Sequence, residues 1–509
     1  MDQTAQPTKS EPDLYYRSLK GGYWVISSRI AVNFLGFIKS LFLFNYFLLN
    51  DLGIISAAVM MMEIMSTLTQ TGFESALIQK KEDIRDYLDT AWTAGLLKGI
   101  FLFAVLFSAA PLLAMFRIPQ EKVPLAIWAF RAMSVCFLIQ GFHNIGAVYF
   151  SKNLDFHKTF LLSAASSLTD IVLSISLVLI LRSIWGVIAA RLVSGIVTCI
   201  GTYVLSSYRP RLQFKPAKAG ELWKYGRWIF GQNVLGYLLE NGDDFFVWFY
   251  LGIQPLALYR AAYQFSNAPF MQINSFFHQV LFPAFSKLQD DPERLRQAYL
   301  KVCRVASAVA IPSCLLIFSL GPDFVRLFLP PRLLPMVPVL QILAFKGLLK
   351  SLSSVRVPFF QAVGKPNVLL LLMWLRVSVL CLTIYFCTRA WGIVGTAVSV
   401  TLVNILVNPV ALLLMRMQYQ YKIGEVLKQS LLAWCAGALM TLLVLGIKQT
   451  ACPDANYICF FGLLIVGALS YLLILIGLDR YKSYGYRDML REQYILLCKA
   501  MQKSRKMFM

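Results

Sequence analysis

Charged residues are scarce in this chain, and the two signs are unequally represented. Only 15% of the 509 residues are charged, 58% are hydrophobic, and 48 Lys and Arg stand against 26 Asp and Glu. A soluble protein of this length carries more charge and fewer apolar residues. The composition therefore argues against an ordinary soluble domain and indicates a polytopic membrane protein.

Motifs for catalysis and metal binding are also missing. The sequence has no P-loop, nucleophile elbow, HExxH motif or glycine-rich nucleotide fingerprint. Its ten cysteines form no CxxC pair and its three histidines show no ligand spacing with them, so we expect neither metal nor disulfide chemistry. We therefore expect no enzyme and no cofactor, and any transport would draw on an ion gradient or on the substrate's own gradient.

The formal net charge of +22 has two interpretations. It could indicate a nucleic-acid partner, or it could reflect the accumulation of Lys and Arg in the cytoplasmic loops of membrane proteins. The basic residues concentrate in every second loop between apolar segments, for example at Arg209, Arg211, Lys215 and Lys218. We therefore expect no nucleic-acid partner and predict that both termini lie in the cytoplasm.

Apolar segments long enough to cross a bilayer recur along the chain, which predicts an all-α membrane protein of about fourteen transmembrane helices. Their expected positions are residues 22–48, 53–78, 90–115, 125–150, 159–181, 184–207, 223–250, 255–284, 300–328, 335–362, 367–387, 391–415, 427–447 and 457–478.

Short matches suggest that the first twelve helices form two halves. Trp185-Gly186 resembles Trp391-Gly392, and Ala110-Pro111 resembles Gly321-Pro322. Because six is even, two six-helix halves have the same orientation, which predicts parallel repeats with a binding site between them. The expected divisions are a cytoplasmic N-terminus at 1–21, an N-lobe at 22–208, a cytoplasmic linker at 209–221, a C-lobe at 222–417, an extra helix hairpin at 418–478 and a basic cytoplasmic tail at 479–509.

Polar side chains interrupt four of these helices at spacings that place them on one helical face. A charge at the bilayer centre costs roughly 2.5–3.5 kcal/mol, so such faces should contact protein or water. The four rows are Arg29, Asn33, Gly36 and Ser40; Glu63, Thr67, Gln70 and Glu74; Asn233, Glu240 and Asp244; and Arg260, Gln264, Asn267, Asn274 and His278. They predict a central water-filled cavity, although such residues can also simply bond neighbouring helices.

Further basic residues lie within apolar segments, where each could bind phosphate or instead reach the membrane interface or pair with Asp170. They are Arg131, Arg191, Lys346, Lys350, Arg356 and Arg376.

The stretch FPAFSKLQDDPERLRQAYLK at residues 282–301, preceded by Gly252, Leu258-Tyr259 and Ala262, resembles the polysaccharide transport family. Its members are Wzx-type flippases for lipopolysaccharide, O-antigen and colanic-acid precursors, within the multidrug/oligosaccharidyl-lipid/polysaccharide exporter superfamily. The resemblance implies translocation of undecaprenyl-diphosphate-linked oligosaccharide across a bacterial inner membrane, by alternating access between two lobes. Membrane lipids, and a polysaccharide polymerase and glycosyltransferases, would be its partners.

That substrate suggests roles for the polar rows. Basic groups would hold the diphosphate and amides would contact the sugars. The expected substrate-binding residues are Arg29, Asn33, Arg260, Gln264, Asn267, Lys350 and Arg376. The residues expected to couple transport to a proton or sodium gradient are Glu63, Glu74, Glu240 and Asp244.

Two alternative functions remain. One is a multidrug or organic-cation antiporter of the same fold, which fold analogy cannot separate from a flippase. The other is a non-transporting scaffold of a polysaccharide synthase complex. The basic excess among the intramembrane charges favours an anionic substrate, and a scaffold would not need four aligned polar rows.

Overall fold

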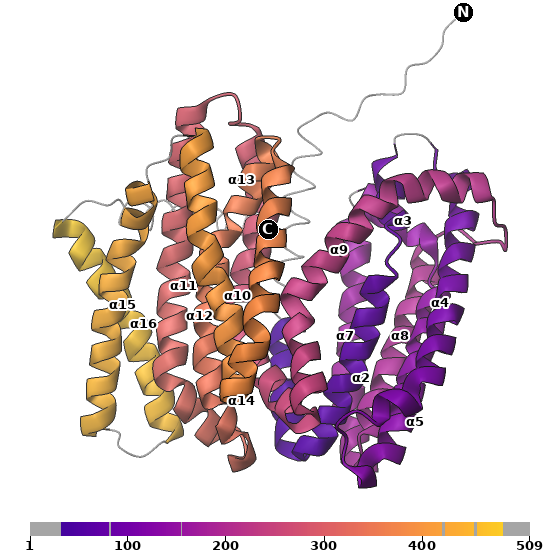
Figure 1. Ribbon diagram of the computed structural model, residues 1–509, viewed down its shortest axis with the longest axis horizontal. Helices are drawn as coiled ribbons and strands as arrows, with labels where there is room; N and C mark the ends of the chain where they lie inside the picture. The colour runs from indigo at the N-terminus through magenta and orange to yellow at the C-terminus, as the bar shows by residue number, and fades with distance from the viewer. Residues whose placement is uncertain (1–31, 81–82, 154, 420–422, 452–455, 482–509) are drawn as a thin grey trace, which may run out of the picture. The chain divides into compact units, whose positions relative to one another are not determined.

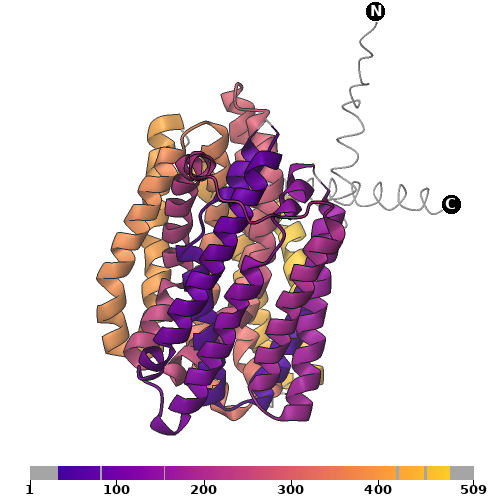
Figure 2. The ribbon, with the colours of Figure 1, turned by 90° about the vertical axis from the view of Figure 1, so that its right-hand side faces the viewer.

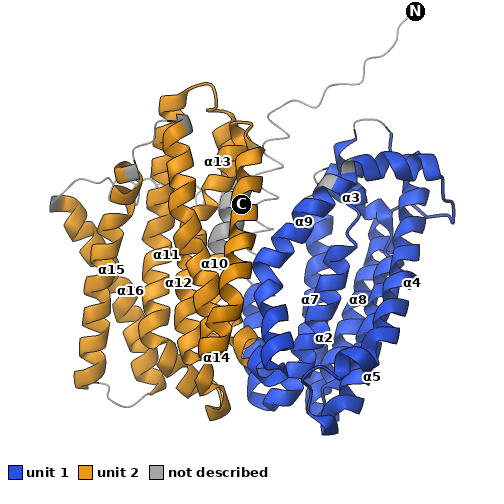
Figure 3. Cartoon of the chain, viewed as in Figure 1, with its two compact units in different colours: residues 1–257 blue, residues 258–509 orange. Residues whose placement is uncertain are grey.

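The computed structural model describes residues 32–80, 83–153, 155–419, 423–451 and 456–481. Within these ranges the chain is built of helices and turns, and it contains no strand. It divides into two compact units, residues 1–257 and residues 258–509, which are coloured separately in Figure 3. The expected all-α membrane fold is therefore confirmed.

Unit 1 is a bundle of long helices joined by short turns (Figures 1 and 2). A helix through residues 32–46 is followed by α2 (Leu49–Leu68), α3 (Phe73–Gln79), α4 (Arg85–Ala114), η1 (Gln120–Lys122), α5 (Val123–Gly141), η2 (Ile145–Ala147), α6 (Val148–Lys152), α7 (Phe156–Leu181), α8 (Trp185–Leu205) and α9 (Pro216–Leu251). α5 packs against α4 and α8, α8 also packs against α7, and α9 packs along α2. The first helix of the expected C-lobe thus falls in unit 1, and the division at residue 222 stays a prediction.

Unit 2 is a second helical bundle. Its elements are α10 (Ile253–Ser286), which begins just before the division, α11 (Pro292–Phe328), η3 (Pro331–Met336), α12 (Val337–Ser354), α13 (Arg356–Ala362), α14 (Pro366–Tyr419), α15 (Ile423–Ala451) and α16 (Tyr457–Tyr481). α11 lies at the centre of its packing, because it contacts α12, α15 and α16.

The 54-residue element α14 is two helices folded back on each other at Gly392. Gly392 has a φ of 56°, a backbone conformation that glycine adopts without steric cost. Hydroxyl pairs join the two limbs, Thr383 to Ser399 at 2.6 Å and Thr388 to Thr396 at 2.9 Å. These pairs converge on the turn, so α14 supplies two spans, as the segments expected at 367–387 and 391–415 require.

A similar close approach occurs in the hairpin of α7 and α8. A Cβ atom on Gly186 would lie 2.6 Å from the backbone nitrogen of Val178, and one on Gly395 would lie 1.8 Å from the carbonyl oxygen of Cys387. In both hairpins a glycine shortly after the turn therefore allows two backbones to touch.

The turns that precede α5 and α12 resemble each other. Each is a 3₁₀ turn, η1 or η3, and each following helix begins with Val-Pro, at Val123-Pro124 and Val337-Pro338. Proline suits the first turn of a helix because the backbone N–H it lacks would have no intrahelical partner there. These likenesses support the expected internal repeat, which stays a prediction.

The last two helices, α15 and α16, attach to unit 2 along α11. Apolar side chains such as Met440 fill the middle of this contact. Ion pairs hold its two ends, Arg296 to Glu425 at 2.5 Å and Lys448 to Asp323 at 2.6 Å. The hairpin is thus packed into unit 2 rather than loosely tethered to it.

Ten of the described helical segments are long and apolar enough to cross a membrane. One of them, residues 367–417, contains both limbs of α14, while α9 and α10 are long but are not among the ten. The total of fourteen spans stays a prediction.

One cysteine corrects the sequence analysis. Cys459, in the first turn of α16, is disulfide-bonded. The expectation of no disulfide chemistry is therefore wrong at this end of the α15–α16 hairpin. Disulfides persist in oxidising compartments, and this end of α16 is the one expected to face away from the cytoplasm.

The tight turn in α14 makes a stability prediction. In a Gly395→Ala variant the added Cβ would collide with the carbonyl of Cys387, and the two limbs must separate. Overpacking of this kind costs about 1–3 kcal/mol. We expect a lower melting temperature of the full chain in detergent.

Gly446→Ala is the matched control, because no heavy atom lies within 4 Å of a Cβ at that α15 position. Equal melting temperatures for Gly395→Ala and Gly446→Ala would show that the hairpin is not closed by this contact.

Candidate functional site

A half-buried ion pair joins two helices of unit 1. The Nζ atom of Lys39, on the helix through residues 32–46, lies 2.5 Å from Oδ2 of Asp170 on α7, and the side chains are 15% and 16% exposed. Arg191 on α8 lies within electrostatic range of Lys39. Charges removed from water need such partners, because an unpaired buried ion is strongly destabilising.

This pair was only partly anticipated from the sequence. A basic partner for Asp170 was expected among residues such as Arg131 and Arg191, but the partner is Lys39. The guanidinium of Arg131 instead lies over the rings of Phe107 and Trp128, at 4.7 Å and 5.3 Å. The available signal was a lysine within an apolar segment, which is costly in a bilayer unless it has a specific role.

The polar rows of the second and seventh expected helices meet in unit 1. The side-chain amide of Asn233 on α9 donates to Oε1 of Gln70 at 2.7 Å. The backbones approach closely at the same place, since a Cβ on Gly226 would lie 2.1 Å from the carbonyl oxygen of Thr71. Within α9, Asp244 is buried and Glu240 is half-buried.

The row expected on the second helix is not one helical face. α2 ends at Leu68, and Gly72 adopts a φ of 70° before α3 begins at Phe73. Glu63 and Thr67 therefore lie on α2, whereas Glu74 lies exposed on α3. The expectation of a continuous row from Glu63 to Glu74 is wrong, because glycine at this position allows the helix to be interrupted.

Lys98 is a second lysine that was not singled out from the sequence. It is half-buried within α4 and lies in electrostatic range of Glu74. This places a basic group near one of the acidic residues expected to couple transport.

Two of the rows in unit 1 face space that the described helices do not fill. A Cβ added at Gly36, or at Gly236 on α9, would meet no heavy atom within 4 Å. Gly36 lies on the same helical face as Asn33 and Ser40, and Gly236 lies on the face of Asn233. Asn33 is exposed, so this polar face is uncovered, and the central water-filled cavity stays a prediction.

In unit 2 the expected row on α10 is unevenly exposed. Gln264 is exposed, Arg260 is half-buried, and Asn267 is only 4% exposed. The side chains of Asn274 and His278 lie outside the described part of the structure, as does the whole of Arg29.

The basic residues of α12 lie against α10. Lys346 is buried, with its ammonium 4.7 Å from the centre of the Tyr263 ring. One residue on, a Cβ at Gly347 would lie 2.3 Å from the ring of Phe270, so the two helices are in direct contact. Lys350 follows one turn after Lys346 and is half-buried, like Arg376 on α14.

Arg356, at the start of α13, connects two helices of unit 2. It is buried and donates hydrogen bonds to the carbonyl oxygen of Asn408 at 3.0 Å and to its Oδ1 at 2.7 Å. These contacts fasten α13 to the second limb of α14. Of the described residues, no three His, Cys, Asp or Glu side chains are grouped so as to hold a metal ion.

The helical bundles and their buried charges define a polytopic membrane protein with the fold of known transporters. A structure of the lipid II flippase MurJ in an inward closed conformation matches with a TM-score of 0.75, covering 90% of this chain and 99% of that one at 16% identity. A multidrug resistance MATE family transporter in an inward-facing conformation matches with a TM-score of 0.62, covering 78% of this chain and 98% of that one at 17% identity.

The chain belongs to the polysaccharide biosynthesis protein family, whose sequence profile matches residues 48–338. It is 24% identical over 340 residues to the lipopolysaccharide biosynthesis protein WzxC of Escherichia coli, covering 66% of this chain and 68% of the relative. It is also 24% identical over 348 residues to the succinoglycan biosynthesis transport protein ExoT of Rhizobium meliloti, covering 68% and 69%. The resemblance inferred from residues 282–301 is confirmed.

The Lys39–Asp170 pair makes a second prediction. Replacing one partner, as in Lys39→Met, leaves a half-buried carboxylate without its counter-charge. Full burial would make this cost about 3–5 kcal/mol, and the partial exposure of the pair lowers it. We expect a large loss of stability when the purified protein is unfolded with SDS, and partial recovery in the double variant Lys39→Met with Asp170→Leu.

The exposed pair of Lys158 and Asp155 is the control, because its side chains are 42% and 38% exposed and such pairs contribute little. If Lys39→Met is no more destabilising than Lys158→Met, the Lys39–Asp170 pair does not hold the helices of unit 1 together.

Proposed function

We propose that this protein translocates an undecaprenyl-diphosphate-linked oligosaccharide across the bacterial inner membrane for the synthesis of a surface polysaccharide. The observation that carries the proposal is membership of the polysaccharide biosynthesis protein family. Two relatives are named as a lipopolysaccharide biosynthesis protein and a succinoglycan biosynthesis transport protein, and a protein of similar fold is named as a lipid II flippase. On this proposal the chain is a transporter and not an enzyme.

The chemistry of such a substrate matches the polar features inside the helices. Its sugars need hydrated polar surfaces, and the uncovered faces that carry Asn33 and Asn233 supply them. Its diphosphate needs cations, for which arginine offers bidentate hydrogen bonds and lysine a point charge. We assign this role to Arg29 and Arg260, assisted by Lys350 or Arg376, while the lipid tail stays in the bilayer.

We further propose that transport follows alternating access and is coupled to a proton or sodium gradient. A carboxylate that is alternately buried and hydrated can exchange a proton or a cation between the two states. Glu240 and Asp244 are half-buried and buried on α9, which also carries the uncovered face of Gly236, and Glu63 is half-buried on α2. Exposed Glu74 is the weakest member of this group.

The phosphate-binding role of Arg260 can be tested in cells that lack the gene for this protein. We expect lipid-linked oligosaccharide to accumulate on the cytoplasmic leaflet, and wild type to reverse this. Arg260→Ala should restore surface polysaccharide poorly, because a hydrogen bond to a charged group contributes about 1.5–3 kcal/mol. The measurement is the leaflet distribution of the intermediate at matched protein abundance.

Arg294→Ala is the control, because that side chain is 76% exposed and pairs with Asp291 on the surface. Full polysaccharide synthesis by Arg260→Ala would remove Arg260 from the site. A deletion strain that accumulates no intermediate but becomes sensitive to cationic drugs would overturn the flippase in favour of an exporter.

Gradient coupling is tested by transport into vesicles with an imposed proton or sodium gradient. Glu240→Gln removes the exchangeable charge and should abolish the dependence of rate on the gradient. Glu121→Gln, an exposed change in η1, should leave the dependence as in wild type. An unchanged gradient dependence in Glu240→Gln would exclude Glu240 as the coupling residue.

A further inference from the structure

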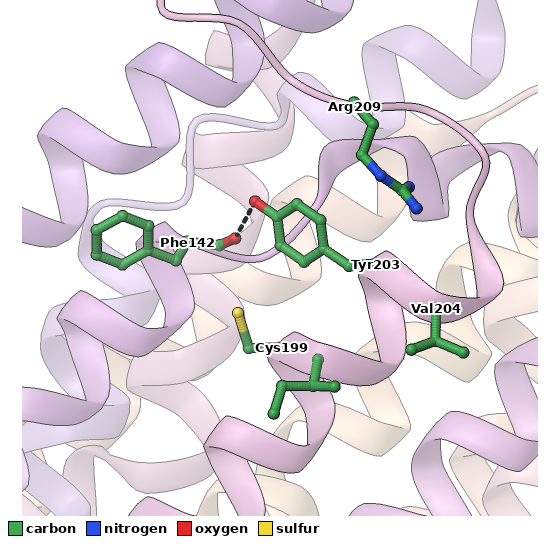
Figure 4. Close-up of a pocket in the computed structure, with 6 residues that line it drawn as sticks. Phe142, Cys199, Tyr203, Val204 and Arg209 are labelled. Carbon is green, nitrogen blue, oxygen red and sulfur yellow. Dashed lines mark hydrogen bonds between the residues drawn. The ribbon is translucent and has the colours of Figure 1, made fainter.

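Two hollows of unit 1 share one residue, Arg209. The first is an apolar pocket of about 490 Å³ at the end of α8 (Figure 4). Its lining residues are Phe142, Cys199, Ile200, Tyr203, Val204 and Arg209. All but Arg209 offer mainly carbon or sulfur surface, so the pocket suits a hydrocarbon chain with a polar group at one end.

This pocket opens on the outside of the bundle. Ile200 and Val204 are 56% and 75% exposed, and Phe142 is 48% exposed. They lie on α8 and directly after α5, two of the segments apolar enough to cross a membrane. The Tyr203 hydroxyl donates to the carbonyl of Phe142 at 3.0 Å and braces one wall. In a bilayer this surface meets lipid tails.

The second hollow is polar and has a volume of about 910 Å³. It is lined by residues 205–215, by the beginning of α4, by η2 and α6, and by the beginning of α7, and it also includes Arg209. A pocket of this size is large enough for a lipid headgroup, since small-molecule sites typically measure roughly 300–1,000 Å³.

The linker wall of the polar hollow is held in place by α4. The hydroxyl of Tyr208 and the backbone N–H of Arg211 both donate to Oδ1 of Asp89, the latter at 2.8 Å. Burial and the hydrogen bond to Asp89 raise the pKa of Tyr208, so it remains a neutral donor at physiological pH. Further along, the backbone of Gln213 pairs with Thr93 Oγ1 at 3.2 Å. The wall is therefore a formed surface.

The carboxylates of the hollow already have partners. Besides Asp89, Asp86 accepts from Lys218 at 2.9 Å, and Asp155 pairs with Lys158 at 3.3 Å. Asp83 accepts from the backbone N–H of Arg85 at 3.0 Å. Lys218 and Lys158 offset part of the repulsion that the carboxylates would exert on an anion. The arginines that also line the hollow are therefore the groups left to bind one.

Arg209 lines both hollows. Its Nη1 atom donates to the carbonyls of Ser206 at 2.7 Å and Tyr208 at 3.0 Å, which fixes the guanidinium. Among the described residues, none accepts a hydrogen bond from its Nη2 or Nε atoms. Arg211 and Lys215 line the same polar hollow and add positive charge.

We propose that these two hollows form one binding site for an anionic phospholipid, with an acyl chain in the apolar pocket and the phosphate at Arg209. The site belongs to the end of unit 1 that carries the basic linker, the side expected to face the anionic cytoplasmic leaflet. Because the linker forms a wall of the headgroup site, a bound lipid holds residues 206–215 against α4. This role is independent of the transported substrate.

Membrane phospholipid is the occupant that the dimensions favour. A free phosphate leaves the apolar pocket unfilled. A polyprenyl diphosphate shares the headgroup chemistry, but the pocket follows only residues 199–204 of α8, about 8 Å of helix. That length accommodates the upper part of one acyl chain, and phospholipid is the most abundant amphiphile in the bilayer.

The test measures lipid binding to the full-length protein in detergent by native mass spectrometry, with phosphatidylglycerol and phosphatidylcholine of matched chains. Wild type should prefer phosphatidylglycerol. Arg209→Gln should weaken phosphatidylglycerol binding about fivefold, the effect of one cationic side chain near an anionic headgroup. It should weaken phosphatidylcholine binding less, because the choline cation offsets the attraction between Arg209 and the phosphate. Ile200→Trp should weaken both lipids by filling the apolar pocket.

Arg182→Gln is the matched control, because it changes an exposed arginine at the other end of the α7–α8 hairpin. A photoreactive phosphatidylglycerol that labels wild type within residues 199–209 would support the site even if a variant failed to fold. Unchanged phosphatidylglycerol binding in Arg209→Gln, labelling confined to other segments, or displacement by undecaprenyl diphosphate at tenfold lower concentration would each overturn the phospholipid assignment.

Discussion

The cost of placing charge in hydrocarbon governs where the polar residues of this chain lie. A bilayer provides no water to an ammonium, guanidinium or carboxylate, so each must find a protein partner or a hydrated surface. Lys39 meets Asp170, and Arg356 is held by the backbone and side chain of Asn408. These contacts tie helices that are distant in sequence, and they give each bundle a defined arrangement that apolar packing alone would specify weakly.

The hydrocarbon of the bilayer also constrains the backbone. Peptide groups in hydrocarbon must bond within the chain, so spans are helical and turns must be tight where two helices return on each other. The hairpins of α7–α8 and α14 meet this requirement with glycines that let backbones touch at Gly186 and Gly395. The Val-Pro dipeptides that begin α5 and α12 are a further local feature present in both units.

Hydropathy and charge in the sequence were enough to predict an all-α membrane fold, and residues 282–301 were enough to indicate the family. The two limbs of α14 were also anticipated, because Trp391-Gly392 separates two apolar runs. Local conformation was harder to predict. Glu74 was placed on the wrong element because the spacing argument assumes an unbroken helix. In the structure Gly72 adopts a left-handed conformation, and a separate helix begins after it.

Contacts between residues that are distant in the sequence were also hard to predict. The sequence left open that one of several basic residues pairs with Asp170, and only the tertiary structure identifies Lys39 as the partner. The disulfide of Cys459 was not expected, because disulfide formation depends on the distance between two cysteines in the fold rather than on a sequence motif. The open space beside Gly36 and Gly236 was likewise not predictable, because it depends on where the other helices lie.

The charges within the bundles fall into two classes by burial, fully buried and half-buried. Arg356 is buried against Asn408, and its removal would act first on folding. Arg260 and Lys350 are half-buried, and Gln264, on the same helix as Arg260, is exposed. A transporter needs both classes, since rigid bundles must move without losing their internal pairings while the hydrated groups exchange one set of contacts for another. The pattern of burial in this chain therefore fits a protein whose units stay intact while a polar substrate passes.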